Sequence, residues 1–287
     1  MSTLELDLDL PDGRTLHAYD SGVSDDPRAL TVMWHHGTPN VGAPPAPLFP
    51  ISARLGIRWV SYDRPGYGGS SPLPGRDVGS AAADALAVVD ALGADRFAVM
   101  GHSGGGPHAL ACAALLPERV LAAVSVSGLA PYGVEDLDWF AGMAPSAAAS
   151  LEAARHGRAA KERYEASAGD GDPGFIAADL DALSDEWSWF GGIVDAAVAS
   201  GPGGLIDDDL AYVAPWGFDP STITAPALLV HGAADRAIPS SHSEWLASAC
   251  PSAELRLIPD EGHVSVMRSA PAALEWLRAR AGESAAP

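Results

Sequence analysis

Leucine occupies every second position from residue 4 to residue 10, and acidic residues fill the positions between. A period of two is typical of a strand with one buried face. Residues 11–14, Pro-Asp-Gly-Arg, predict a turn, after which residues 15–19 can pair back as a second strand. The start of the chain therefore predicts an antiparallel hairpin.

Apolar runs alternate with helix-like segments through most of the remaining chain. The runs predict buried strands at residues 29–35, 57–62, 97–101, 120–127, 227–231 and 255–258. The segments between them predict helices at residues 77–92, 104–116, 240–249 and 264–281. This alternation is typical of the α/β class, so we expect a mostly parallel, twisted sheet of about eight strands flanked by helices.

Residues 131–224 interrupt the alternation. They show no strand pattern and combine Ala-rich, helix-like stretches with breaks rich in Gly and Asp. We therefore predict a helical cap inserted at residues 131–224, and a core formed by residues 1–130 and 225–287. Two tryptophans of this cap, Trp139 and Trp189, are predicted to line a substrate pocket.

Ser103 stands in the sequence Gly101-His102-Ser103-Gly104-Gly105, between a predicted strand and a predicted helix. Glycines allow the sharp turn that this setting needs, and a G-x-S-x-G turn of this kind presents a nucleophilic serine. The free N–H groups at the start of the helix favour negative charge developing beside it. These features make Ser103 a candidate nucleophile.

A serine nucleophile needs a base, and the base needs an orienting carboxylate. His263 follows the last predicted strand, and Asp235 follows the preceding one. Parallel strands end at one edge of a sheet, where open α/β sheets place their sites. We therefore predict a catalytic triad of Ser103, Asp235 and His263.

Acyl transfer also needs two N–H donors for the oxyanion that forms. Gly104, directly after the nucleophile, supplies one of them. Thr38, in the sequence His36-Gly37-Thr38-Pro39 at the end of another predicted strand, is placed to supply the second. Thr38 and Gly104 are the predicted oxyanion hole.

Together these segments resemble the α/β-hydrolase family. Residues 36–39 are similar to its H-G-x-P oxyanion loop, and residues 62–70 contain a D-x-x-G-x-G-x-S segment like that of the family. Residues 231–235 and 262–263 resemble its acid and base positions. The resemblance covers almost the whole chain outside residues 131–224, which correspond to the family's variable cap.

This resemblance implies a serine hydrolase that forms an acyl-enzyme on Ser103 and needs no metal and no cofactor. A serine at the turn argues against the dehalogenase and epoxide-hydrolase branches, which use aspartate there. The single glycine before Thr38 differs from the roomier G-G-G-x loop that suits bulky tertiary-alcohol esters. We therefore expect small to medium carboxylic esters as substrates.

Three other functions fit the same residues. An aminopeptidase of the proline-iminopeptidase kind needs cap carboxylates to hold the substrate amine, and the cap contains many acids. A carbon–carbon bond hydrolase or lyase would use the same groups on a ketone or cyanohydrin. A non-enzymatic small-molecule receptor would use the pocket without using Ser103.

Charge narrows the range of partners. The formal net charge is −20, and Lys161 is the one lysine of the chain. Such a chain repels nucleic acid and anionic membranes, which bind clustered Lys and Arg. No apolar stretch is long enough for a bilayer span, and the N-terminus lacks the pattern of a signal peptide. We expect a cytoplasmic monomer or small homo-oligomer that acts on a small molecule.

Overall fold

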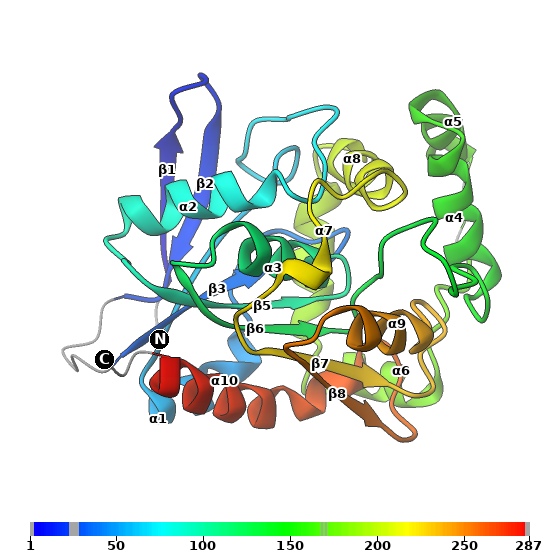
Figure 1. The fold of residues 1–287 in the computed structure, drawn as a ribbon. Helices are drawn as coiled ribbons and strands as arrows, with labels where there is room; N and C mark the ends of the chain where they lie inside the picture. The colour runs from blue at the N-terminus through cyan, green and yellow to red at the C-terminus, as the bar shows by residue number, and fades with distance from the viewer. Residues whose placement is uncertain (1–2, 23–28, 168, 170, 285–287) are drawn as a thin grey trace.

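The computed structural model describes residues 3–22, 29–167, 169 and 171–284, so the ends of the predicted core, residues 1–2 and 285–287, lie outside it. Its strands form one sheet in the order β1-β2-β4-β3-β5-β6-β7-β8 (Figure 1). The strands are β1 (Leu4–Asp9), β2 (Thr15–Asp20), β3 (Leu30–His35), β4 (Ile57–Tyr62), β5 (Phe97–His102), β6 (Val120–Val126), β7 (Ala227–Gly232) and β8 (Ala253–Ile258).

Strand direction in this sheet changes only near its first edge. β1 pairs with β2 and β2 with β4 in antiparallel fashion, and all later neighbours are parallel. The hairpin and the mostly parallel sheet expected from the sequence are both confirmed. The carboxyl ends of the parallel strands consequently meet along one edge.

Helices cover both faces of the sheet (Figure 1). One face carries α1 (Phe49–Leu55) and α10 (Ala270–Ser284), and the other carries α2 (Ala81–Ala91), α3 (Gly105–Leu115) and α9 (Ser241–Ala249). Two short 3-10 helices lie at Ala46–Leu48 and Pro220–Thr222. In the described ranges, none of the helices combines the length and the apolar character that a bilayer span needs.

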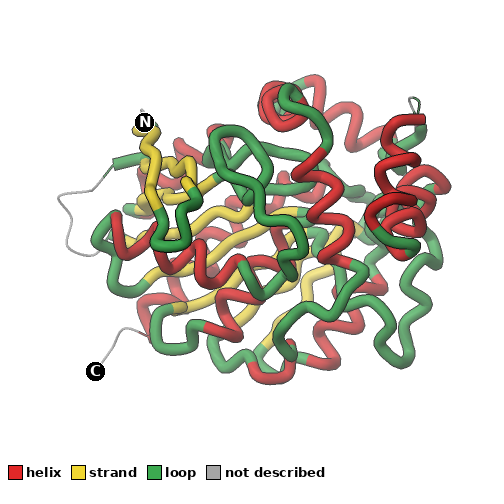
Figure 2. The backbone as a smooth tube through the Cα atoms, turned by 90° about the horizontal axis from the view of Figure 1, so that it is seen from above, coloured by secondary structure: helices red, strands yellow, loops and turns green. Residues whose placement is uncertain are grey.

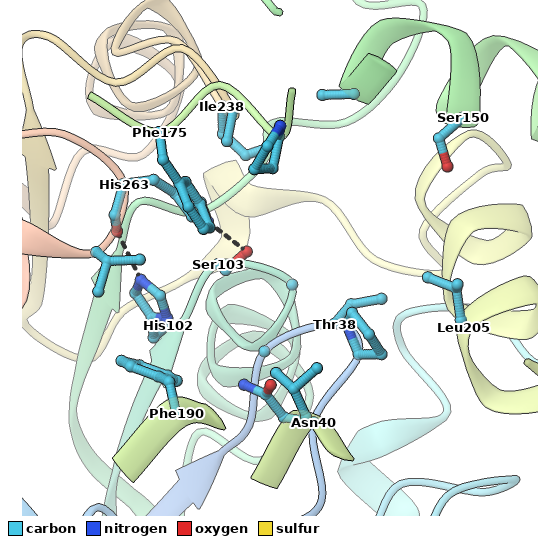
Figure 3. A pocket seen from close by; sticks show the side chains of 18 of the residues that line it. Thr38, Asn40, His102, Ser103, Ser150, Phe175, Phe190, Leu205, Ile238 and His263 are labelled. Carbon is cyan, nitrogen blue, oxygen red and sulfur yellow. Dashed lines mark hydrogen bonds between the residues drawn. The ribbon is translucent and has the colours of Figure 1, made fainter. Parts of the chain in front are cut away.

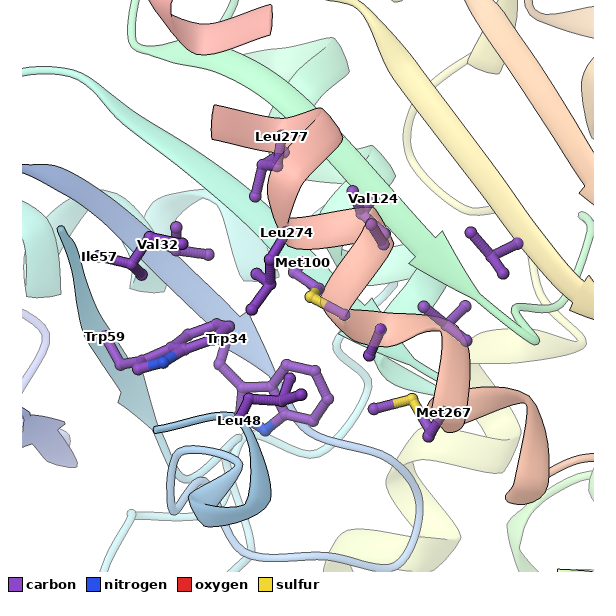
Figure 4. Packing of buried hydrophobic residues seen from close by; sticks show 14 of the residues in the cluster. Val32, Trp34, Leu48, Ile57, Trp59, Met100, Val124, Met267, Leu274 and Leu277 are labelled. Carbon is purple, nitrogen blue, oxygen red and sulfur yellow. The ribbon is translucent and has the colours of Figure 1, made fainter. Parts of the chain in front are cut away.

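Alternating side chains of the strands β3 to β7 enter the two opposite cores. On one face, Trp34 and Trp59 meet edge to face with 6.3 Å between ring centroids, and Leu274 of α10 belongs to the same cluster (Figure 4). On the other face, Met33 lies in a cluster with Leu110 of α3. Neighbouring residues of one strand thus face different layers, as the pleat requires.

The last predicted helix is divided in the structure. Ser265–Ser269 forms a 3-10 helix, and α10 begins at Ala270. Pro271 stands in the first turn of α10, where its missing N–H costs nothing, but it cannot continue an α-helix from the preceding residues. The predicted start at residue 264 was therefore wrong for α10.

The segment from residue 131 to residue 224 lies between β6 and β7, and none of its described residues belongs to a strand. It carries the helices α4 (Pro145–Arg155), α5 (Arg158–Ser167), α6 (Ala177–Ser184), α7 (Trp189–Val198) and α8 (Gly203–Tyr212). In Figure 1, α4 and α5 lie beyond the ends of the strand arrows β5 and β6, and α8 lies above them. Figure 2 shows the same layering from above, with the strands between helices and loops.

Candidate active site

Ser103 lies in a tight turn between β5 and α3. Its φ is +54°, a left-handed conformation that costs energy for a residue with a side chain. The glycines around it are required by close packing. A Cβ on Gly101 would lie 2.1 Å from the Gly105 oxygen, and a Cβ on Gly105 would lie 1.9 Å from the His35 oxygen. The glycine pattern seen in the sequence is therefore what allows this turn.

Ser103, His263 and Asp235 are joined by hydrogen bonds. The Nε2 atom of His263 lies 2.8 Å from Oγ of Ser103 (Figure 3). Its Nδ1 atom lies 2.8 Å from Oδ2 of Asp235. Oδ1 of Asp235 accepts the N–H groups of Ala237 and Ile238, each at 2.9 Å. A proton on Nδ1 donated to Asp235 leaves Nε2 free to accept the serine hydroxyl proton.

The carboxylate and the imidazole shift each other's pKa. Burial opposes a charged His263, but the neighbouring Asp235 outweighs it and raises the pKa of His263 above its ordinary value. Burial likewise opposes a charged Asp235, yet His263 and His231 hold the pKa of that carboxyl far below its usual range. Asp235 thus remains an anion that favours a protonated imidazole.

His102, the residue directly before Ser103, binds the backbone of His263. Burial lowers the pKa of His102 to about 3, so its ring is neutral near pH 7. Its Nε2 donates to the backbone oxygen of His263 at 2.8 Å, and the two ring centroids are 5.1 Å apart (Figure 3). The residue before Ser103 therefore holds the loop that carries His263.

Thr38 and Gly104 lie against each other beside Ser103. A Cβ on Gly104 would lie 2.4 Å from Oγ1 of Thr38, and a Cβ on Gly37 would lie 3.6 Å from Cβ of Ser103. In the part of the chain that the structure describes, neither the Thr38 N–H nor the Gly104 N–H donates a hydrogen bond. Two backbone N–H groups that donate no hydrogen bond to the described residues thus lie close to Ser103.

A buried polar cluster stands behind Thr38. Asp208 of α8 accepts Oγ1 of Thr38 at 2.6 Å and pairs with Arg64 and Arg76, also at 2.6 Å each. The hydroxyl of Tyr212 lies 2.8 Å from Thr38 Oγ1 and donates to the Gly104 oxygen at 3.1 Å. No pattern in the sequence pairs these residues with Thr38, because they come from separate parts of the chain.

A cavity of about 520 Å³ opens beside Ser103 and His263. Phe175, Phe190 and Ile238 line it on the His263 side, whereas Ser150 and Leu205 lie on the opposite side (Figure 3). Most of its other lining side chains are apolar, namely Pro39, Leu129, Ala147, Leu151, Pro173, Leu183, Val194, Ala237 and Val264. The immediate surroundings of the serine therefore suit an apolar group.

The structure places both predicted pocket tryptophans outside the lining of this cavity. Trp139 is buried against Tyr132 and Phe140, and its Nε1 donates to the Ala130 oxygen at 2.8 Å. Trp189 packs on Phe190, which does line the cavity. The residue that follows Trp189 in the sequence therefore lines the cavity, whereas the Trp189 indole does not.

The acids of α8 are engaged in ion pairs. Asp207 pairs with Arg158, Asp208 with Arg64 and Arg76, and Asp209 with Lys161 at 2.5 Å. Asp209 lines the cavity, and burial raises the pKa of its carboxyl although Lys161 opposes the shift. Within the described ranges, no group of three His, Cys, Asp or Glu side chains is arranged to hold a metal ion.

Comparisons with known proteins agree with this fold. Residues 31–270 match the sequence model of the family described as alpha/beta hydrolase fold. The structure of a thermophilic esterase from Thermogutta terrifontis is similar with a TM-score of 0.66 and 21% identity, covering 98% of this chain and 99% of that one. The enol-lactonase from Burkholderia xenovorans LB400 gives 0.68 and 22%, covering 96% and 99%. At such identities both similarities concern the fold alone.

One curated relative is similar in sequence over a shorter stretch. A non-heme chloroperoxidase from Streptomyces lividans is 35% identical over 126 residues. The match covers 43% of this chain and 45% of that protein, which is less than half of either. It therefore concerns a shared segment and not the activity of a whole protein.

Proposed function

Because the chain belongs to the α/β-hydrolase fold family, we propose that it is a serine hydrolase that cleaves small to medium carboxylic esters through an acyl-enzyme on Ser103. The observation that carries this proposal is the 2.8 Å contact between His263 Nε2 and Ser103 Oγ, at a left-handed turn that faces an apolar cavity. Two of the similar structures are named an esterase and an enol-lactonase, and the proposal concerns bonds of that class.

Acylation begins when His263 removes the hydroxyl proton of Ser103 as Oγ attacks the ester carbonyl carbon. The carbonyl oxygen becomes an oxyanion, and the N–H groups of Thr38 and Gly104 stabilise it. Asp235 holds the imidazole in its tautomer and stabilises the imidazolium that forms. His263 then gives its proton to the leaving alkoxide oxygen, so an alcohol departs and the acyl group stays on Ser103.

Deacylation repeats these steps with water. His263 accepts a proton from water as its oxygen attacks the acyl carbon, and the same two N–H groups stabilise the second oxyanion. The C–O bond to Ser103 then breaks, and Oγ takes the proton back from His263. The products are a carboxylic acid and the free hydroxyl of Ser103, so atoms and charge balance over the cycle.

The cavity supports small and medium substrates with an apolar part. A volume of about 520 Å³ lies within the range of small-ligand pockets. Of the two acids in the lining, Asp209 is paired with Lys161 and Asp195 is exposed, so neither offers a buried, unpaired carboxylate for a substrate amine, which weighs against the aminopeptidase alternative. The ester reading is therefore the better supported of the two.

The test is turnover of p-nitrophenyl esters from acetate to hexanoate, with a lactone and Pro-β-naphthylamide in the same panel. We expect hydrolysis of the esters by the unchanged protein, and covalent labelling of Ser103 by a fluorophosphonate. Ser103→Ala should remove both, with a loss of roughly 10⁴-fold or more in kcat. No turnover of any ester and no labelling would overturn the proposal, and faster cleavage of the naphthylamide would favour an aminopeptidase.

A further inference from the structure

Asp179 is a fully buried carboxylate at the start of α6 that takes no part in the mechanism above. It lies against the loop that carries His263, although 84 residues separate the two along the chain. Its Oδ2 accepts the backbone N–H of His263 at 3.2 Å. Its Oδ1 accepts the N–H groups of Val264 and Ser265, each at 2.8 Å. One side chain of the segment between β6 and β7, residues 131–224 (the inserted segment), therefore binds three successive backbone N–H groups.

The same carboxylate also belongs to its own helix. Oδ2 of Asp179 accepts the N–H of Ile176 at 3.0 Å, which satisfies one of the free donors at the start of α6. All four of these donors are backbone N–H groups. Peptide N–H dipoles at the junction of α6 and the His263 loop thus hold the negative charge of Asp179. Among the described residues, no Arg or Lys side chain donates a hydrogen bond to it.

Gly262 permits this contact. A Cβ at residue 262 would lie 2.2 Å from Oδ2 of Asp179 and 2.7 Å from its Cγ. Any side chain larger than hydrogen would therefore push the carboxylate away from the His263 N–H. The sequence showed Gly262 only as part of a motif. The contact with Asp179 explains why a glycine stands before His263.

His263 is held from two sides through its backbone. Asp179 binds its N–H, and His102 donates to its carbonyl oxygen at 2.8 Å. The ring then reaches from this fixed backbone to Ser103 and Asp235, at 2.8 Å each. Because both of these ring contacts are at hydrogen-bond distance, a small shift of the backbone would break at least one of them.

We propose that Asp179 is a positioning residue, which couples the inserted segment to the catalytic site by holding the backbone of His263 where its imidazole reaches Ser103. This inference rests on the proposed function, since it takes His263 as the base. Asp179 is not among the residues that line the cavity. It acts through His263, and its loss should slow the chemical steps more than it weakens substrate binding.

The charge of Asp179 has an effect on the pKa of His263 that packing alone would not have. The groups that face His263 are Asp235, Asp179 and the neutral His102. Burial opposes a protonated His263, while Asp235 and, to a lesser degree, Asp179 raise the pKa of the imidazole. Removing the charge of Asp179 therefore lowers that pKa, and the acid limb of activity moves to lower pH.

The experiment compares Asp179→Asn with Asp181→Asn, a loss of the same charge at an exposed position of the same helix. For Asp179→Asn we expect kcat on a p-nitrophenyl ester to fall roughly 10- to 100-fold with KM within about twofold, because misplacement of a catalytic group acts on the chemical step. The acid limb of kcat/KM should shift to lower pH. Asp181→Asn should keep the kcat, KM and pH profile of the unchanged protein.

Gly262→Ala is the second variant, and it keeps the charge of Asp179 while displacing its carboxylate. It should lower kcat in the same direction as Asp179→Asn. In an Asp179→Ala background, the added Gly262→Ala change should cost little more, because the atoms that it meets are gone. Fully additive losses, or kcat and a pH profile like those of the unchanged protein in Asp179→Asn, would overturn the proposal.

Titration of His263 followed by NMR of ¹³Cε1-labelled histidine separates this proposal from the proposed function. If the unchanged protein hydrolyses no ester and Ser103 is not labelled, the proposed function fails. The NMR titration still reports on Asp179, since it needs no substrate. A lower pKa of His263 in Asp179→Asn supports the contact, and an unchanged pKa in a folded Asp179→Asn contradicts it.

Discussion

Oγ1 of Thr38 donates to Oδ2 of Asp208 at 2.6 Å, although 170 residues separate the two along the chain. Asp208 belongs to α8 of the inserted segment, and Thr38 lies in the loop after β3. Asp208 also accepts the Tyr67 hydroxyl at 2.9 Å, besides pairing with Arg64. The inserted segment thus contacts the loop of Thr38 through Asp208, and the loop of His263 through Asp179.

Removing the charge of Asp208 should destabilise the protein strongly. Asp208→Asn leaves the buried guanidinium groups of Arg64 and Arg76 without their counter-ion. Breaking a buried ion pair by loss of one partner costs about 3–5 kcal/mol in the free energy of unfolding. Urea denaturation followed by circular dichroism measures this loss. Arg280→Met, which breaks the exposed pairs with Glu254 and Glu283, should leave the midpoint unchanged.

Equal midpoints for Asp208→Asn and Arg280→Met would show that the buried cluster adds nothing to stability. A denaturation curve with a changed slope would instead indicate that the compactness of one state has changed. The comparison is matched because each variant removes one charge that takes part in two ion pairs, those of Asp208 with Arg64 and Arg76 or those of Arg280 with Glu254 and Glu283. The pairs differ in burial, which is the variable under test.

Ester hydrolysis should depend on the protonation of His263. Below its pKa the imidazole carries a proton and cannot accept the one from Ser103, so kcat/KM falls as pH decreases. Asp235 raises the pKa of His263, so the acid limb should lie above the ordinary histidine value of about 6.5. A pH profile of kcat/KM on a neutral ester measures it, and an acid limb well below pH 6.5 would contradict the assignment.

Asp235→Asn should keep the fold and remove most of the activity. The amide can no longer stabilise the imidazolium or hold Nδ1–H in the required tautomer. We expect kcat to fall by roughly 10⁴-fold, with the acid limb moved to lower pH. Steady-state kinetics check the first expectation and the pH profile checks the second. Activity close to that of the unchanged protein would require another carboxylate as the partner of His263.

Tyr212→Phe should weaken the support of the oxyanion donors while leaving the cavity intact. The Tyr212 hydroxyl contacts Oγ1 of Thr38 and donates to the Gly104 oxygen. A net hydrogen bond is worth about 0.5–1.5 kcal/mol, which corresponds to roughly a 2- to 12-fold loss in kcat. KM should change little. A raised KM with unchanged kcat would place Tyr212 in substrate binding instead.

Leu205→Trp should shorten the range of accepted acyl chains. Leu205 lines the cavity on the side opposite His263 (Figure 3), and the larger indole fills part of the space there. Each methylene excluded from the cavity forfeits about 0.8 kcal/mol of burial. Relative to the acetate ester, kcat/KM for the hexanoate ester should fall at least tenfold. Parallel losses on both esters would mean that the cavity does not hold the acyl chain.

The sequence by itself determined the fold and the local turn at Ser103. Hydrophobic periodicity separates strands from helices because each element must bury one face, and the glycines at 101 and 105 are dictated by steric contacts within a few residues of the turn or on a neighbouring strand. The sequence also placed Ser103, Asp235 and His263 after strands of one sheet, where parallel strand ends converge.

Only the tertiary structure decided what surrounds these residues. The contacts of Asp179 with His263 and of Asp208 with Thr38 join parts of the chain separated by 84 and 170 residues, and no local pattern encodes such a pairing. Trp139 and Trp189 looked suited to a pocket, yet packing left both outside its lining. Burial of a side chain depends on which faces meet after folding. The contacts of the inserted segment could therefore be identified only in the tertiary structure.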